Sequence, residues 1–315
     1  MKSEKSRYRL LIIISLIVIG NIPSSAQMSS ILEIAAGGGG STLGYKLSSP
    51  ISTLDVAHKG SWAFVAHGEY ILMFNNYIGL GMGLDLSHLG DRTSINGQMQ
   101  WNDVIDTDGE GYNHHLTISQ WHDNQDVWYL QPGVFVHASV PVSTNWTIIL
   151  AAGGRYGFPI SNRLSYNGTT CHKGLYPQWG LTLSEMENHG FYTATASMQT
   201  TDWKANRMID LVLRAGVQYH IGKYTALVVR AWVACGVTDA LRITSSNRAL
   251  GFANDKPGME KIHYFMNDYT SVLATNLVTD PHSKPIAAGL EIGVRWIFPH
   301  PSKRTNICRC LDVYR

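Results

Sequence analysis

The stretch from Tyr77 to His88, YIGLGMGLDLSH, alternates strictly between two kinds of residue. Its even-numbered positions from Ile78 to Leu86 are aliphatic, and the odd-numbered positions between them are glycine or small polar residues. Successive side chains of a β-strand point to opposite sides, so this strand has one hydrocarbon face and one face of nearly bare backbone. Such a strand needs an apolar environment on one side and a crowded one on the other.

Eight segments of the chain show this period of two, which predicts eight strands of about ten to thirteen residues each. Two of them, near the start of the chain, alternate less cleanly than the others. The eight expected strands are residues 31–41, 61–74, 77–88, 127–140, 146–157, 208–220, 224–236 and 286–298.

The links between these strands are short and long in strict alternation. The short links are FNN, PVSTN and HIGK, and the long links are residues 46–60, 89–126, 158–207 and 237–285. In an up-and-down barrel, alternate links lie at the same end, so one rim carries tight turns and the other carries large loops. The pattern predicts a single domain that is an all-β, eight-stranded antiparallel up-and-down barrel with long loops.

One face of the expected strands carries glycine, polar and charged residues, and we call it the mixed face. Its composition indicates which side of the barrel is the interior. No lysine occurs within the eight strand cores, and charged residues make up only 15% of the chain, against about 25% in a typical soluble domain. A water-facing surface, as in a lipocalin-like barrel, would be richer in lysine and glutamate. We therefore expect the mixed face to line a narrow lumen, where each arginine finds a carboxylate. The expected ion-pair network is Glu33, Glu69, Asp85, Arg155, Asp210, Arg214, Arg230, Glu291 and Arg295.

Aromatic residues cluster at the two ends of the apolar face. Two aromatic girdles that flank an aliphatic band are typical of a barrel that spans a membrane, with lipid as its partner. The girdle expected at the short-turn rim is Phe74, Trp146, Tyr219, Trp296 and Phe298, and the one at the long-loop rim is Trp62, Trp128 and Tyr156.

The first residues have the form of an export signal. A basic leader, MKSEKSRYR, precedes the hydrophobic run LLIIISLIVIG and the small-residue segment NIPSSAQ, which predicts a signal peptide over residues 1–26, cleaved after Ala26. The run is too short for a membrane-spanning helix, which needs about 20 apolar residues. The barrel is then expected over residues 27–298, followed by a short periplasmic tail over residues 299–315.

The charge of the expected mature chain argues against a nucleic-acid partner. Removal of residues 1–26 takes away four basic residues and one acidic residue, so the net charge falls from +2 to 2 − 3 = −1. A protein that binds nucleic acid carries a basic excess, which is absent here.

The four cysteines are too few for a disulfide framework. Cys308 and Cys310 form a C-x-C motif near the end, which could bind a metal or pair with another chain. We expect both to be ordinary thiols.

The export signal, the eight alternating strands and the two kinds of link resemble the small OmpA-type outer-membrane barrels. The Gly-rich first strand and the long last loop before IAAGLEIGVRWIF resemble the barrel proteins of the Bacteroidetes group. The resemblance implies insertion into the outer membrane of a Gram-negative bacterium by the barrel insertion machinery. The residues after Phe298 are too few for the peptidoglycan-binding domain of the full-length family, so wall anchoring is not implied.

Two motifs are candidates for chemistry, and we expect neither to be a catalytic or metal site. His137 and Ser139 resemble the His-x-Ser pair of lipid A deacylase barrels, but their parity turns both inward, away from lipid. The segment DTDGEGYNHH, residues 106–115, starts like a calcium loop and lacks the remaining ligand spacing, so a solvated acidic loop is expected. No cofactor is implied.

Three function classes stay open at this point. The first is a structural or surface-interaction barrel whose lumen is filled by the ion-pair network, with an unidentified extracellular ligand for its loops. The second is a narrow porin-like diffusion channel, and the third is a lipid A-modifying enzyme. We favour the first, because eight strands enclose only enough space for side chains and because long loops on a rigid scaffold commonly carry recognition. The loop tryptophans Trp101, Trp121, Trp179 and Trp203 either form a binding surface or pack the loops together.

Overall fold

The regular structure of the protein is entirely β. The computed structural model describes residues 28–47, 53–106, 108–186, 189–200, 205–241, 278–280 and 282–299. Its strands are β1 (Ser29–Thr42), β2 (Lys46–Leu47), β3 (Leu54–Met73), β4 (Ile78–Ile105), β5 (Gly111–Pro141), β6 (Trp146–Tyr176), β7 (Leu181–Leu183), β8 (Thr193–Thr200), β9 (Met208–His220), β10 (Thr225–Gly236), β11 (Val278–Asp280) and β12 (Ile286–Pro299). Across the described residues, we find no helix with the length and apolar character needed to cross a membrane.

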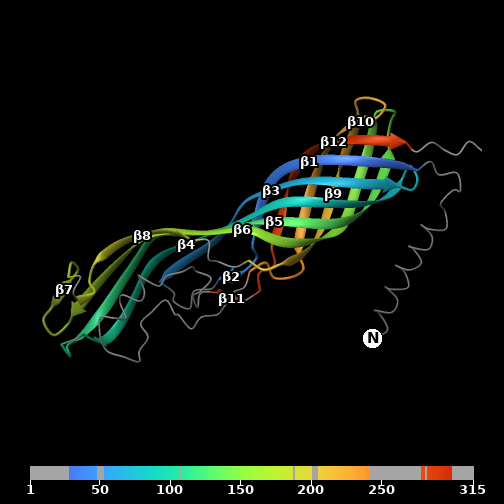
Figure 1. Ribbon diagram of the computed structural model, residues 1–315. Helices are drawn as coiled ribbons and strands as arrows, with labels where there is room; N and C mark the ends of the chain where they lie inside the picture. The colour runs from blue at the N-terminus through green and yellow to red at the C-terminus, as the bar shows by residue number, and fades with distance from the viewer. Residues whose placement is uncertain are drawn as a thin grey trace, which may run out of the picture.

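Eight of these strands close into an antiparallel barrel (Figure 1). The order around the ring is β5-β4-β3-β1-β12-β10-β9-β6, and pairing between β5 and β6 completes it. The first and last strands of the chain pair along their whole length, from Ser29 opposite Pro299 to Thr42 opposite Ile286. Closure leaves no unpaired strand edge within the ring. The prediction of an eight-stranded up-and-down barrel is confirmed.

All three short links are tight turns, and two of them are stabilised by their own polar side chains. In the β3–β4 turn, the Asn75 side-chain oxygen accepts hydrogen bonds from the backbone N–H groups of Tyr77 and Ile78, at 2.8 and 2.7 Å. In the β5–β6 turn, the Ser143 hydroxyl accepts one from the N–H of Trp146 at 3.2 Å. Asparagine and serine favour turns because their side chains satisfy nearby backbone groups in this way.

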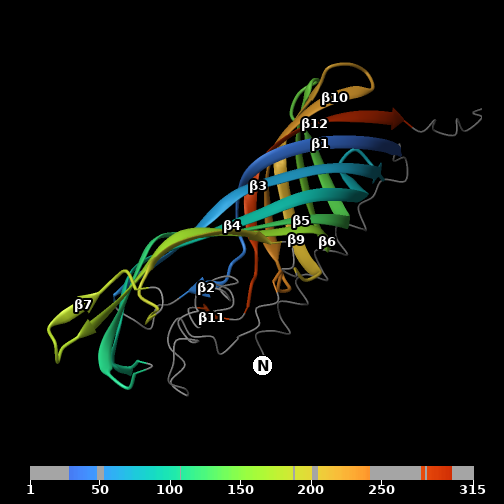
Figure 2. The same cartoon turned by 60° about the vertical axis from the view of Figure 1, so that its left-hand side comes forward.

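Three of the expected long loops, residues 46–60, 89–126 and 158–207, are wrong, because strands occupy most of each; β2 and the start of β3 lie within 46–60. β4 continues to Ile105, β5 begins at Gly111 and β6 continues to Tyr176, so residues 89–126 and the first part of 158–207 extend three barrel strands. β7 and β8 add to the edge of β6. We call this extension, residues 91–106, 108–126, 161–186 and 189–200, the arm. It projects from the rim opposite the start of β1 and the end of β12 (Figures 1 and 2).

The sequence of the arm lacks the pattern of lipid-facing strands because the outer face of the arm is polar. Its inner face carries Ile95, Met99, Leu116 and Ile118, all nearly buried, while the alternate positions are mostly hydrophilic. A two-sided sheet needs only one apolar face when the other meets water. Register shifts at Gly60/Ala63 and at Trp128/Tyr129 lie where the strands leave the barrel, and such bulges bend strands.

Candidate functional site

The barrel interior holds the nine charged residues that the alternation of side chains along the strands predicts there. Every one of them is at most 5% exposed, and they come from seven of the eight barrel strands: Glu33, Glu69, Asp85, Arg155, Asp210, Arg214, Arg230, Glu291 and Arg295. An unpaired charge in such a place costs several kcal/mol, so the arrangement depends on how these groups pair.

The first half of the network centres on Asp85. Arg155 binds Asp210 through two nitrogens, at 2.9 and 2.6 Å, and reaches Asp85 with a third at 2.8 Å. Arg214 donates to the same Asp85 oxygen at 2.6 Å and to Glu69 at 3.1 Å. Asp85 therefore lies between two guanidinium groups that come from different strands, β6 and β9.

The second half centres on Glu33. Arg230 and Arg295 both form ion pairs with this carboxylate, and Arg230 also pairs with Glu291. The Arg214 Nε atom lies 3.8 Å from Glu291, which joins the two halves. The result is one continuous network of ion pairs across the lumen, and within each half the pairs are charge-assisted hydrogen bonds.

Four uncharged or titratable side chains complete the network, and the charge-based prediction missed them as members. His67 Nε2 lies 2.9 Å from Glu33 and 2.8 Å from Arg230, and His137 Nε2 lies 2.5 Å from Glu69. The Gln218 oxygen accepts from Arg295 at 2.8 Å, and the Gln131 amide donates to Asp210 at 3.1 Å. All four share the inward parity of the charged residues, which is the sequence signal that identifies them.

The glycines of the inner face make room for these long side chains. A Cβ atom on Gly81 would lie 2.1 Å from a carboxylate oxygen of Glu69 and 2.8 Å from Nε2 of His137. A Cβ atom on Gly133 would lie 2.9 Å from Cγ of Arg155. Both glycines are therefore required by close approach rather than by backbone conformation.

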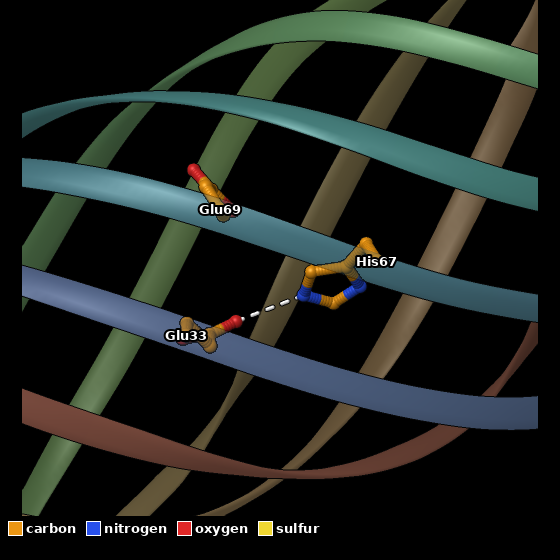
Figure 3. A group of neighbouring side chains, drawn as sticks. All are labelled: Glu33, His67 and Glu69. Atoms are coloured by element: carbon orange, nitrogen blue, oxygen red, sulfur yellow. Dashed lines mark hydrogen bonds and ion pairs between the residues drawn. The ribbon is translucent and has the colours of Figure 1, made fainter.

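One part of the network has the composition of a metal site. Glu33, on β1, and His67 and Glu69, on β3, each bring one ligand atom to within 4.8 Å of the others (Figure 3). Guanidinium groups already occupy the neighbouring positions, because Arg230 and Arg295 pair with Glu33 and Arg214 pairs with Glu69. Another cation there would be repelled by three arginines, so the group serves as an ion-pair centre.

Apolar side chains close the lumen on both sides of the network. At the short-turn rim, Ile31, Ile71 and Met73 pack together, each at most 6% exposed, with Ile297 against them. At the arm rim, a larger cluster includes Leu43, Tyr129, Trp232 and Leu241, and the Tyr129 hydroxyl donates to the carbonyl of Ala240 at 3.2 Å. The charged layer thus lies between two apolar layers.

The exterior of the barrel shows the opposite character. Leu80, Met82, Leu84, Leu211 and Leu290 are between 42% and 66% exposed. The eight girdle aromatics also lie on this face, all exposed or half-buried: Trp62, Phe74, Trp128, Trp146, Tyr156, Tyr219, Trp296 and Phe298. Trp62 stacks on His88 with ring centroids 3.8 Å apart, and Trp146 contacts Tyr219 at 4.8 Å. Among the described residues, the barrel surface is thus aliphatic between two aromatic rims.

The candidate catalytic pair does not meet this outer surface. His137 is 2% exposed and engaged by Glu69, and Ser139 follows it on the same inner face, half-buried near the short-turn rim. Cys171 and Cys235 are free thiols. Residues 1–26, Trp203, Cys308 and Cys310, with nearly all of the tail, lie outside the described residues.

The acidic part of segment 106–115 is an exposed turn, as expected, whereas its last residues belong to β5. The Asp106 carboxylate accepts hydrogen bonds from the N–H groups of Asp108 and Glu110, at 3.0 and 2.8 Å, and from the hydroxyl of Tyr176 at 2.9 Å. Beyond the turn, His114 is 1% exposed while His115 is half-buried. Asp106 therefore holds the tip of the arm together.

The three described loop tryptophans pack in different parts of the arm. Trp179 stacks on Tyr176 with centroids 5.1 Å apart and is 57% exposed, whereas Trp121 stacks on Tyr166 and is buried. Trp101 is half-buried against the inner cluster. Of these three tryptophans, Trp179 alone presents most of its surface to the outside.

The fold and its interior define a class: a closed eight-stranded antiparallel β-barrel with an aliphatic exterior and an ion-paired lumen. No protein-family model and no curated protein sequence matches the chain. Solved structures with a similar trace include Neisserial surface protein A (10% identity, TM-score 0.32, covering 85% of this chain and 96% of that one) and the outer membrane protein OprG from Pseudomonas aeruginosa (10% identity, TM-score 0.34, covering 88% and 98%). Another is Ail, the attachment invasion locus protein of Yersinia pestis (10% identity, TM-score 0.25, covering 86% and 99%), in complex with the heparin analogue sucrose octasulfate. Similarities this low carry no inference about activity.

Proposed function

We propose that this protein is an integral outer-membrane β-barrel with a structural or surface-interaction role and a lumen that does not conduct. The barrel serves as a rigid base, and the arm presents a surface outside the membrane. The proposal includes the finer features that the sequence implies: export by a signal peptide cleaved after Ala26, insertion by the barrel machinery, and origin in the Bacteroidetes group.

The exterior supports the membrane location. Exposed leucine and methionine side chains such as Met82 and Leu290, at 63% and 66% exposure, cover a surface that water would disfavour. Burial of apolar surface is worth about 25 cal/mol per Å². A bilayer supplies that burial, and the closed ring leaves no backbone group of its strands unpaired in hydrocarbon.

The layered interior is the main observation that supports a closed lumen. A path through the barrel must cross the apolar layer at Ile71, the ion-pair layer at Glu33 and Arg214, and the apolar layer at Leu241. Eight-stranded barrels have room only for side chains, and here those side chains contact one another across the interior. Hydrated ions would have to displace all three layers.

The arm supports the surface-interaction role. It extends the sheet well beyond the barrel, and a stacked pair of rings, Tyr176 and Trp179, stands at its end. Segments that project from a rigid scaffold commonly bind partners, and exposed aromatic side chains are enriched among residues that do so.

Two measurements test the proposal. Unboiled and boiled samples should migrate differently in SDS gels, because a closed barrel resists SDS until heated. In a planar bilayer, the purified protein should give no steady conductance, and Arg230→Ala should remain closed because the two apolar layers stay in place. Equal mobility together with solubility in plain buffer would refute the membrane barrel. Steady wild-type conductance with altered ion selectivity in Arg230→Ala would instead establish a channel.

A further inference from the structure

The basic residues of the described chain are segregated by position. Of the twelve lysines and arginines it contains, four lie in the lumen. Five are exposed just beyond the aromatic girdle of the rim from which the arm projects. We call these five the cation belt: Lys59, Arg92, Arg163, Arg207 and Lys284. The remaining three are Lys46, Lys173 and Lys223.

Strand pairing places the belt residues at a similar height around the rim from which the arm projects. Lys59 pairs with Arg92 across β3 and β4. Arg163 on β6 pairs with Asp126 of β5, which lies two residues from Asn124, the β5 partner of Arg92. Arg207 lies two residues before the exposed Ile209, and Lys284 two residues before the exposed Ile286. Each cation thus follows closely on the aliphatic surface.

The aromatic rim lies directly beneath these cations. Lys59 is three residues from Trp62, which is 53% exposed, and the Arg207 guanidinium carbon lies 5.7 Å from the centre of the Phe158 ring. Aromatic side chains prefer the level of lipid headgroups. Side chains that stand a few residues further out along the strands are therefore at the level of the headgroup phosphates.

The carboxylates near the belt are engaged by histidines. Asp91 is 2.7 Å from His58, Asp126 is 3.2 Å from His88 and Asp239 is 3.0 Å from His282. Asp55 lies four residues further out than Lys59 on β3. A larger group stands at the far end of the arm and consists of Asp103, Asp106, Asp108 and Glu110. An anionic surface at the girdle would attract the belt and repel the arm tip.

We infer that the cation belt binds the phosphate groups of anionic lipids in the leaflet from which the arm projects. This inference rests on the proposed membrane location and adds to it the headgroup chemistry and the leaflet. Lys and Arg next to an anionic membrane surface each contribute favourable binding that decays within a Debye length. The same attraction would fix the height of the barrel in the bilayer and direct the acidic arm tip away from it.

The test is the association of spin-labelled phosphatidylglycerol with the protein in phosphatidylcholine vesicles, measured relative to spin-labelled phosphatidylcholine. Arg163→Gln removes one belt charge, and Lys173→Gln, on the same strand β6 but further out along the arm, is a control with the same charge change outside the belt. We expect the preference for phosphatidylglycerol to fall by about fivefold for each belt charge removed at low salt, and to be unchanged in the control.

Two further outcomes would overturn the inference. An equal preference in the two variants would show that the belt does not select anionic lipid. Displacement of the labelled lipid by inorganic phosphate, at matched ionic strength, would show a site for free phosphate instead. Flotation with the vesicles separates the two proposals: a protein that does not float fails the membrane location, whereas one that floats without a lipid preference fails only this inference.

Discussion

Arg214 joins both halves of the lumen network at the scale of single residues. Its guanidinium group contacts Asp85, Glu69 and Glu291, and its face lies 4.3 Å from the ring of Phe135. Removal of one partner of a buried ion pair typically costs about 3–5 kcal/mol, because the other charge is left buried without compensation.

Arg214→Met should therefore lower the free energy of unfolding by about 3–5 kcal/mol in detergent micelles, measured by urea titration. Two controls define the comparison. Arg163→Met, at an exposed position on β6, should change it by only about 0.5 kcal/mol or less, and Leu211→Ala, on the 58% exposed outer face, by clearly less than Arg214→Met. Equal losses in all three would contradict the inward position of Arg214.

The arm is the element whose stability depends on histidines that stay neutral. His114 and His172 lie on β5 and β6 with ring nitrogens 3.1 Å apart, and both are at most 2% exposed. Burial, together with the neighbouring His172 and His115, lowers the pKa of His114 to about 3, and burial lowers the pKa of His172 to about 4. Around them pack Tyr112, Tyr176 and Phe191.

Acid should consequently open the arm before it opens the barrel. Both histidines take up protons more readily in the unfolded arm, where the ordinary pKa is about 6.5, than in the folded arm. Stability is thus complete above about pH 6.5 and falls as the pH drops toward the folded values near 4 and 3.

Hydrogen exchange of residues 112–118 and 170–176, corrected for the intrinsic rate, should rise between pH 7 and pH 5 relative to β9 and β10. The variant His114→Phe/His172→Phe should remove this acid dependence, whereas His115→Phe should retain it. An arm whose protection is the same at both pH values would exclude the mechanism.

The whole molecule has two unlike ends, and this polarity predicts its orientation. β1 begins and β12 ends at the short-turn rim, and the arm leaves from the other rim (Figure 1). An arm outside the cell exposes Trp179 and Leu181, at 57% and 45% exposure, to an added protease.

Chymotrypsin added to intact cells should accordingly cut near Trp179 and leave a protected barrel fragment. The paired strands should resist, since their backbone is hydrogen-bonded on both sides. Trp179→Ser/Leu181→Ser should slow this cut without changing barrel mobility in unboiled gels. An arm that is protected in intact cells and cut only after lysis would reverse the orientation.

Sequence by itself determined the barrel, because two independent physical constraints act on each strand. A strand alternates its side chains between two faces, and a closed barrel gives those faces unlike surroundings, so the alternation in Tyr77–His88 is visible in one dimension. The short links FNN, PVSTN and HIGK then imposed antiparallel neighbours. The same parity separated Arg214 and Glu69 from Leu211 and Leu84 without any knowledge of contacts.

Only the tertiary structure decided which charges pair and where the strands end. Arg214 and Asp85 are 129 residues apart, and their contact depends on the stagger of the strands around the ring and on the closure of β5 against β6. The arm was hidden because its outer face is polar, so its strands lack the lipid-facing pattern and resemble loops in sequence. Closure also brought Ile31, Ile71 and Ile297 together at one rim, because segments at the two ends of the chain become neighbours only when β1 pairs with β12.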